Sequence, residues 1–165
     1  DQDLHSFVAQ RIAASPGDIV DPEGHVLGRH RGLPFYTVGQ RHGLGVALGE
    51  PAYVIRLDAQ ENRLVVGSPE RLLTTCAELY DVRWLMRPGG QELSVRARIR
   101  YRGRRSPAQV TVTGERAVVR FSERQRAVAP GQSIVFYDGD TVLGGGVVAQ
   151  SHIECIDADQ GHPAD

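Results

Sequence analysis

The hydrophobic positions of this chain follow two different periods. Near the N-terminus, apolar residues recur at helical spacing until Pro16-Gly17 ends the pattern, and they are Leu4, Phe7, Val8 and Ile12. Beyond Pro16, apolar residues alternate with polar ones in short runs that glycine, proline or charged turns separate, as is typical of β-strands. The sequence therefore predicts a mostly β protein with one short N-terminal helix.

The β pattern divides into two parts. Two hairpins are expected first, one over residues 18–30 with its turn at Pro22-Glu23-Gly24, and one over 53–66 with a polar turn at 58–62. About six further short strands follow, which favours an antiparallel barrel or sandwich. We expect a helix plus a small β domain over residues 1–74, a β-barrel over 75–152, and a flexible tail over 153–165.

One segment, VRARIRYRGRR at residues 95–105, has an unusual charge pattern. Its apolar residues alternate with Arg96, Arg98, Arg100 and Arg102, so an extended strand would have one face made entirely of guanidinium groups. Such a row of like charges is strained, and we expect a group of opposite sign close by. The formal net charge of the whole chain is only -1, so this cluster is a local feature.

Composition excludes several chemistries. All 19 basic residues are arginine, so the chain has no lysine for a phosphate-binding loop, a Schiff base or pyridoxal phosphate. Cys76 and Cys155 lie too far apart for a zinc ribbon, and we expect free thiols in a cytoplasmic protein. The sequence shows no transmembrane run, no histidine pair at metal-ligand spacing and no catalytic motif, so we expect no metal site and no membrane contact.

The glycine-rich segment YTVGQRHGLGVALG at residues 36–49 does not fit the dinucleotide fingerprint, because its glycine spacing is wrong and no helix pattern follows. Two interpretations stay open. The segment is either a structural loop with unusual backbone angles, or a loop that lies against a ligand and presents Gln40, Arg41 and His42 to it.

The arginine segment gives the strongest functional prediction. The arginine fork binds phosphate at two points, and a neighbouring tyrosine offers a face for base stacking, so we expect an RNA-binding surface. Three alternatives remain. The arginines form a solvated face that acidic neighbours balance, the barrel docks an acidic protein partner, or the chain is a small enzyme with Cys76 as its nucleophile.

Several stretches together resemble one known family. GLPFYTVGQRHGLGV (32–46), AYVIRLDAQENRLVVG (52–67), RARIRYRG (96–103) and AVAPGQSIVFYDGDTVLGGGVV (127–148) resemble the C-terminal half of bacterial tRNA-specific 2-thiouridylases. The resemblance implies a small central domain followed by a β-barrel similar to the second domain of elongation factors, both of which help to hold tRNA. It also implies an N-terminal domain that uses ATP with Mg to activate the wobble uridine, and two cysteines that deliver sulfur.

This sequence contains neither the family's ATP-binding loop nor its two cysteines, so we expect the chain to be inactive alone and to bind no cofactor itself. The resemblance implies that Tyr101, Arg102 and Gln132 contact tRNA, beside the neighbouring arginines Arg98, Arg100 and Arg104. It places Gln40, Arg41 and His42 on a loop that faces the catalytic domain or tRNA. The implied partners are tRNA and, through the full-length enzyme, a sulfur-donor protein in the cytoplasm.

Overall fold

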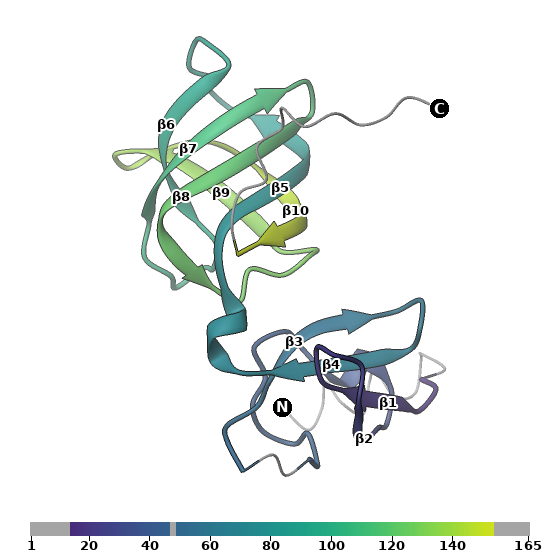
Figure 1. Cartoon of the computed structure of the whole chain (residues 1–165). Helices are drawn as coiled ribbons and strands as arrows, with labels where there is room; N and C mark the ends of the chain where they lie inside the picture. The colour runs from purple at the N-terminus through teal and green to yellow at the C-terminus, as the bar shows by residue number, and fades with distance from the viewer. Residues whose placement is uncertain (1–13, 47–48, 154–165) are drawn as a thin grey trace. The chain divides into compact units, whose positions relative to one another are not determined.

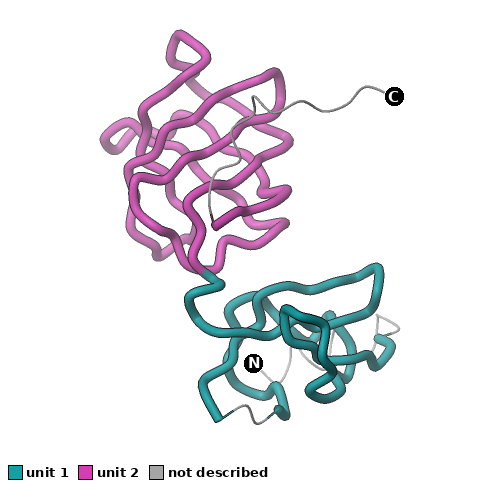
Figure 2. Tube along the Cα trace, in the orientation of Figure 1, with its two compact units in different colours: residues 1–72 teal, residues 73–165 magenta. Residues whose placement is uncertain are grey.

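The computed structural model describes residues 14–46 and 49–153. The chain divides into two compact units, Asp1–Leu72 and Leu73–Asp165 (Figure 2). The helix predicted over residues 4–12 and the predicted tail from residue 154 onward lie outside the described residues. Within the described ranges, no helix is long and apolar enough to cross a membrane.

The first unit is a four-stranded sheet with the order β2-β1-β4-β3 (Figure 1). Its strands are β1 (Gly17–Val20), β2 (Val26–His30), β3 (Tyr53–Asp58) and β4 (Arg63–Gly67), and two short 3₁₀ turns follow β2 and β4, η1 (Leu33–Phe35) and η2 (Pro69–Leu72). Both predicted hairpins are confirmed, as β1–β2 and β3–β4. The parallel pairing of β1 with β4 joins the hairpins into one sheet.

Local chemistry explains the first hairpin, and burial explains how the unit holds together. The Asp21 carboxylate accepts hydrogen bonds from the backbone N–H groups of Glu23 (3.0 Å) and His25 (2.8 Å), which fixes the turn. The unit's core consists of residues from the strands and from the loop between β2 and β3, namely Ile19, Tyr36, Leu44, Val54, Leu64 and Val66.

The second unit is a closed barrel with the strand order β10-β5-β8-β7-β6-β9 (Figure 1). All six neighbouring pairs are antiparallel, so the predicted antiparallel barrel is confirmed. The strands are β5 (Leu73–Trp84), β6 (Glu92–Arg98), β7 (Ser106–Thr113), β8 (Arg116–Arg126), β9 (Ser133–Asp138) and β10 (Thr141–His152).

Inward-facing residues of the six strands fill the barrel. Along β7 every second side chain is buried, and Val110, Val119 and Phe136 are completely enclosed. The Trp84 ring stacks on Phe136 with 5.4 Å between the ring centroids. In β10, a Cβ at Gly144 would collide with the carbonyl oxygen of Arg83, so this glycine allows β10 to approach β5 closely.

Candidate nucleic-acid interface

The arginine segment does not form one continuous strand. Strand β6 ends at Arg98, and its last pairing with β7 joins Ala97 to Ser106. Residues 99–105 form the connecting loop, in which the Gly103 N–H donates to the Arg100 carbonyl oxygen at 2.8 Å and closes a turn. The prediction of a guanidinium face along the strand is therefore wrong beyond Arg98, and Arg100, Tyr101 and Arg102 belong to a loop.

Two arginines of this loop bind the rest of the barrel. Nη2 of Arg100 donates to the carbonyl oxygens of Arg126 (2.8 Å) and Ala127 (3.0 Å). Nη1 of Arg105 donates to the carbonyl oxygen of Gly139 (2.6 Å) and to the carboxylate of Asp140 (2.7 Å). Asp140 supplies one group of the opposite sign that the charge pattern required. The loop is thus anchored near both of its ends, which limits the positions that its tip can adopt.

A buried tyrosine lies beneath the cluster. The guanidinium carbons of Arg98 and Arg105 lie 5.2 Å and 4.1 Å from the centroid of the Tyr137 ring, whose residue is only 9% exposed. Among the described residues, the buried Nε atoms of both arginines have no hydrogen-bond partner. Arg98 is therefore held against the barrel wall by an aromatic face and is only half-exposed.

The tip of the loop projects into solvent. Tyr101 is 90% exposed, the highest value among the exposed large apolar residues of the described chain, and Arg102 beside it is also exposed. Within residues 14–46 and 49–153, no ion pair engages Arg96, Arg102 or Arg104. The barrel residues 73–153 contain 12 arginines and seven acidic residues, a formal net charge of +5. The tip thus combines an aromatic ring and free guanidinium groups on a positively charged barrel.

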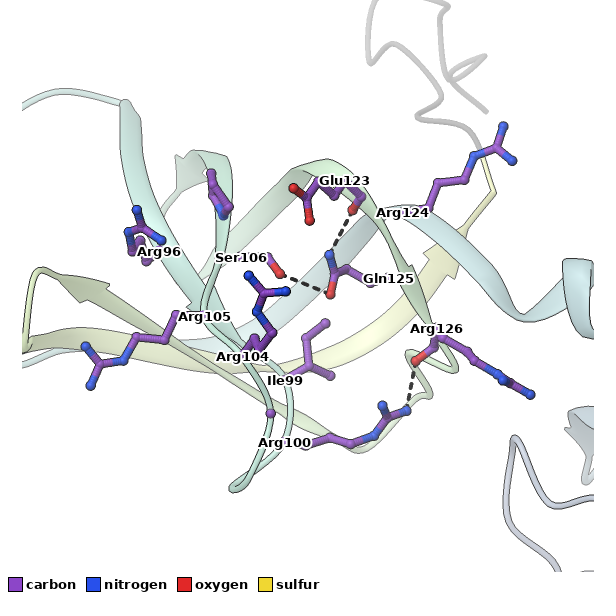
Figure 3. A pocket seen from close by; sticks show the side chains of 12 residues that line it. Arg96, Ile99, Arg100, Arg104, Arg105, Ser106, Glu123, Arg124, Gln125 and Arg126 are labelled. Carbon is purple, nitrogen blue, oxygen red and sulfur yellow. Dashed lines mark hydrogen bonds between the residues drawn. The ribbon is translucent and has the colours of Figure 1, made fainter.

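A pocket of about 430 Å³ opens beside this loop (Figure 3). Residues from the 96–107 segment form one part of its lining, and the last residues of β8 form the other. The lining consists of Arg96, Ile99, Arg100, Gly103, Arg104, Arg105, Ser106, Pro107, Glu123, Arg124, Gln125 and Arg126. The sequence pattern did not predict the contribution of β8, although the segment RQR at residues 124–126 carries its own cluster of charge.

Gln132 has a clear local role. Its Oε1 accepts from the Ala129 N–H at 3.2 Å, and its own backbone N–H donates to the Ala129 carbonyl oxygen at 3.2 Å. The side chain therefore closes the turn before β9 and is only half-exposed. This turn chemistry explains why proline, glycine and glutamine follow one another at 130–132, and a contact of Gln132 with RNA stays a prediction.

The glycine-rich loop of the first unit is held by Gln40. Its Oε1 accepts from the Thr37 N–H at 3.1 Å and its Nε2 donates to the His42 carbonyl oxygen at 2.8 Å. Gly39, Gly43, Gly45 and Gly49 all have positive φ, between 70° and 89°, which supports the interpretation of a loop with unusual backbone angles. Arg41 and His42 project from this braced loop and are exposed.

No metal site emerges in the part of the chain that the structure describes. His30 is 1% exposed, accepts the Gly32 N–H at Nδ1 (3.0 Å) and contacts the Asn62 carbonyl oxygen through Nε2 (3.0 Å). Both ring nitrogens are therefore occupied, and the ring serves the core of the first unit.

Comparison with known proteins assigns both units. Residues 5–68 match the family model described as "tRNA methyl transferase PRC-barrel domain", and residues 74–148 match the one described as "Aminomethyltransferase beta-barrel domain". The tRNA-specific 2-thiouridylase MnmA of Moorella thermoacetica is 47% identical over 152 residues, which cover 88% of this chain. The proteins of the same name from Heliobacterium modesticaldum and Chlorobaculum tepidum are 45% and 46% identical over 92% and 84% of the chain. Over most of its length, the chain is similar to tRNA-specific 2-thiouridylases.

The alignment covers only part of each 2-thiouridylase. The chain spans 42%, 41% and 38% of the length of these three relatives. The two units described above therefore correspond to about two fifths of such a protein. The expected resemblance to tRNA-specific 2-thiouridylases is confirmed.

Cys76 has no accessible thiol that could take part in sulfur transfer. It is 2% exposed within β5 and is disulfide-bonded, so the prediction of free thiols is wrong at this position. Cys155, the other cysteine of the sequence, lies outside the described residues. Sequence spacing did not reveal that the register of β10 pairs His152 with Cys76, which brings the end of β10 beside this residue. Burial argues against Cys76 as a nucleophile.

Proposed function

We propose that this chain is the tRNA-binding C-terminal region of a tRNA-specific 2-thiouridylase, an enzyme that replaces oxygen with sulfur at carbon 2 of the wobble uridine. The observation that carries the proposal is the anchored loop tip with Tyr101 and Arg102 exposed on a barrel of net charge +5. Guanidinium groups bind phosphate at two points, and an exposed aromatic ring stacks on an unpaired base. The similarity to tRNA-specific 2-thiouridylases supports tRNA as the particular RNA.

The chemistry of thiolation would then require residues outside this chain. We assign ATP with Mg, and the sulfur-donor protein, to the remainder of the full-length enzyme, which acts in the cytoplasm. The burial of Cys76 in a disulfide supports this division, because a sulfur carrier needs an accessible thiolate. The purified chain with ATP, Mg and sulfide should give no thiolated tRNA, and a thiolated product above background would contradict this assignment.

The binding proposal is tested by titrating the chain with bulk tRNA at two salt concentrations. We expect weak affinity, about 10⁻⁴ to 10⁻⁶ M, that falls as salt rises, because phosphate contacts release counterions. The variants Tyr101→Ala and Arg102→Ala should each weaken binding. Arg87→Ala is the matched control, since Arg87 is an exposed arginine on the loop between β5 and β6 and should not matter. Absence of binding at low salt would contradict the proposal.

A second candidate function uses the same arginines. A barrel with this charge could dock an acidic protein, such as a sulfur-relay partner, instead of RNA. A competition experiment separates RNA binding from protein docking. We expect tRNA to displace an acidic protein only if both ligands bind this surface. Tight binding to an acidic protein without competition by tRNA would favour the docking function.

Two further contacts belong to the same proposal. Oε1 of Gln132 accepts a hydrogen bond within the turn before β9. The Nε2 amide group is therefore the part of this side chain that can donate to RNA. Arg41 and His42 extend from the loop that Gln40 braces, so they are the part of that loop able to meet the catalytic domain or tRNA. Arg41→Ala should weaken tRNA binding in the full-length enzyme without changing the fold of the first unit.

A further inference from the structure

The pocket beside the loop has a floor whose geometry is fixed. The Ser106 hydroxyl donates to Oε1 of Gln125 at 3.3 Å, and Nε2 of Gln125 donates to the Glu123 carbonyl oxygen at 2.8 Å (Figure 3). Ser106 is 9% exposed, so this small network lies at the base of the pocket. Gln125 uses both ends of its amide group in these two hydrogen bonds. Holding the floor of the pocket in place therefore requires no hydrogen bond from the arginines.

Five of the six arginines that line the pocket fall into two groups. Arg100 and Arg105 use guanidinium N–H groups in the hydrogen bonds that anchor the loop. Arg96, Arg104 and Arg124 form no ion pair with any described residue. In Figure 3 the Arg104 side chain is directed toward the floor, while Arg96 and Arg124 extend from opposite sides of the pocket. The second group is therefore available to a ligand.

The charge of the lining identifies the class of ligand. Six arginines and one carboxylate, that of Glu123, line this small volume. Arginines brought this close repel one another, and an anion between them would lower that energy. The guanidinium group binds phosphate through two parallel N–H donors, which makes a phosphate group the best match.

The lining offers a base no aromatic ring. No aromatic residue is among the lining residues, and Ile99 and Pro107 are the large apolar ones. A nucleobase would find no ring on which to stack, although stacking is the main sequence-tolerant contact with single-stranded nucleic acid. The pocket therefore suits the backbone of a nucleic acid rather than a free nucleotide.

We propose that this pocket binds a phosphodiester group of RNA, with Arg104 as the direct ligand, the Ser106–Gln125 pair as the floor, and Arg96 and Arg124 attracting the backbone from both sides. This site is a second contact, separate from the Tyr101–Arg102 turn, and it rests on the proposed RNA-binding function. The pocket and the turn belong to one continuous segment, residues 96–107, so one RNA backbone can pass from the exposed turn into the pocket.

The test compares three variants of the full 165-residue chain in titrations with bulk tRNA over a series of salt concentrations. Arg104→Gln should lower the slope of log affinity against log salt by about 0.7 to 0.9, the value for one lost phosphate contact. Arg104→Lys retains the charge and should restore most of that slope. Arg87→Gln makes the same charge change on the β5–β6 loop and should leave the slope unchanged. Trp84 fluorescence confirms that each variant is folded.

The outcomes separate this inference from the function on which it rests. If wild type binds tRNA but Arg104→Gln behaves as Arg87→Gln does, the pocket is not a phosphate site, while the proposed function stands. If wild type binds no tRNA at low salt, both fail. Inorganic pyrophosphate is the probe for a free anion, and its binding is followed through the Nε–H signal of Arg104. A pyrophosphate signal that tRNA does not displace would overturn RNA as the source of the phosphate.

Discussion

Arg100 is expected to stabilise the barrel, unlike its exposed neighbour Arg102. Its guanidinium group donates two hydrogen bonds to the carbonyl oxygens of Arg126 and Ala127, and so joins the 99–105 loop to the end of β8. The substitution Arg100→Met retains most of the aliphatic stem and removes only the donors. Arg102→Met makes the same change two residues further on, where no described residue forms an ion pair or a hydrogen bond with the side chain.

The magnitude follows from the position of these bonds. Hydrogen bonds that involve a charged group contribute about 1.5–3 kcal/mol each when they are protected from water. Arg100 is exposed, and water can replace it at the freed carbonyl oxygens, so we expect a total loss of only about 1 kcal/mol. For a barrel of this size, m is about 1 kcal/mol/M in urea, so the urea midpoint should fall by about 1 M.

Fluorescence of the single tryptophan provides the assay. Trp84 packs on Phe136 within the barrel, so its emission follows the unfolding of this unit independently of the first one. Arg100→Met should show the lower midpoint, and Arg102→Met should unfold as wild type does. Equal midpoints for the two variants would refute the reasoning, because the hydrogen bonds of Arg100 would then contribute nothing to the barrel.

Three further predictions follow from other contacts. Ile134→Val, at a fully enclosed position of the barrel, should cost about 0.5–1.5 kcal/mol in the same assay. The His25 pKa should lie above 6.5 in an NMR titration, because the ring hydrogen-bonds the Asp21 carboxylate and feels its charge; Asp21→Asn should bring it back. Since folding raises this pKa, the pair's small contribution to stability is fully present below pH 6.5 and is lost as pH rises through the folded value. His30→Ala removes the Nδ1 atom that accepts the Gly32 N–H, so hydrogen exchange at the Gly32 amide should become faster.

Local sequence patterns were sufficient to predict those features of the fold that depend on residues close together in the sequence. The turn at residues 22–24 follows from the Asp21 carboxylate, which binds backbone N–H groups within four residues of itself. The strands of the barrel follow from alternation, because each one buries a single face. The positive φ angles of the glycine-rich loop follow from its composition.

At the arginine segment, the alternation of apolar and charged residues predicted a strand that is longer than the one observed. The period of two continues from Val95 to Arg102, yet β6 ends at Arg98 because β7 begins its pairing at Ser106, opposite Ala97. A pattern in one strand carries no information on where its partners stop. For this reason the sequence could not show that Arg100 turns back to bind carbonyl oxygens, or that Arg98 lies over Tyr137.

By itself, the sequence determined the β class, the barrel, the resemblance to a family and the positive charge near residue 100, because these depend on composition, on the period of apolar residues and on contiguous motifs. Only the tertiary structure decided which arginines hold the loop, which remain available, and that β8 supplies Arg124 and Gln125 to the pocket. It also showed that Cys76 is buried and disulfide-bonded. The physical reason is that a functional site depends on distances between residues far apart in the chain. Those distances are fixed by the register of strand pairing and the closure of the barrel.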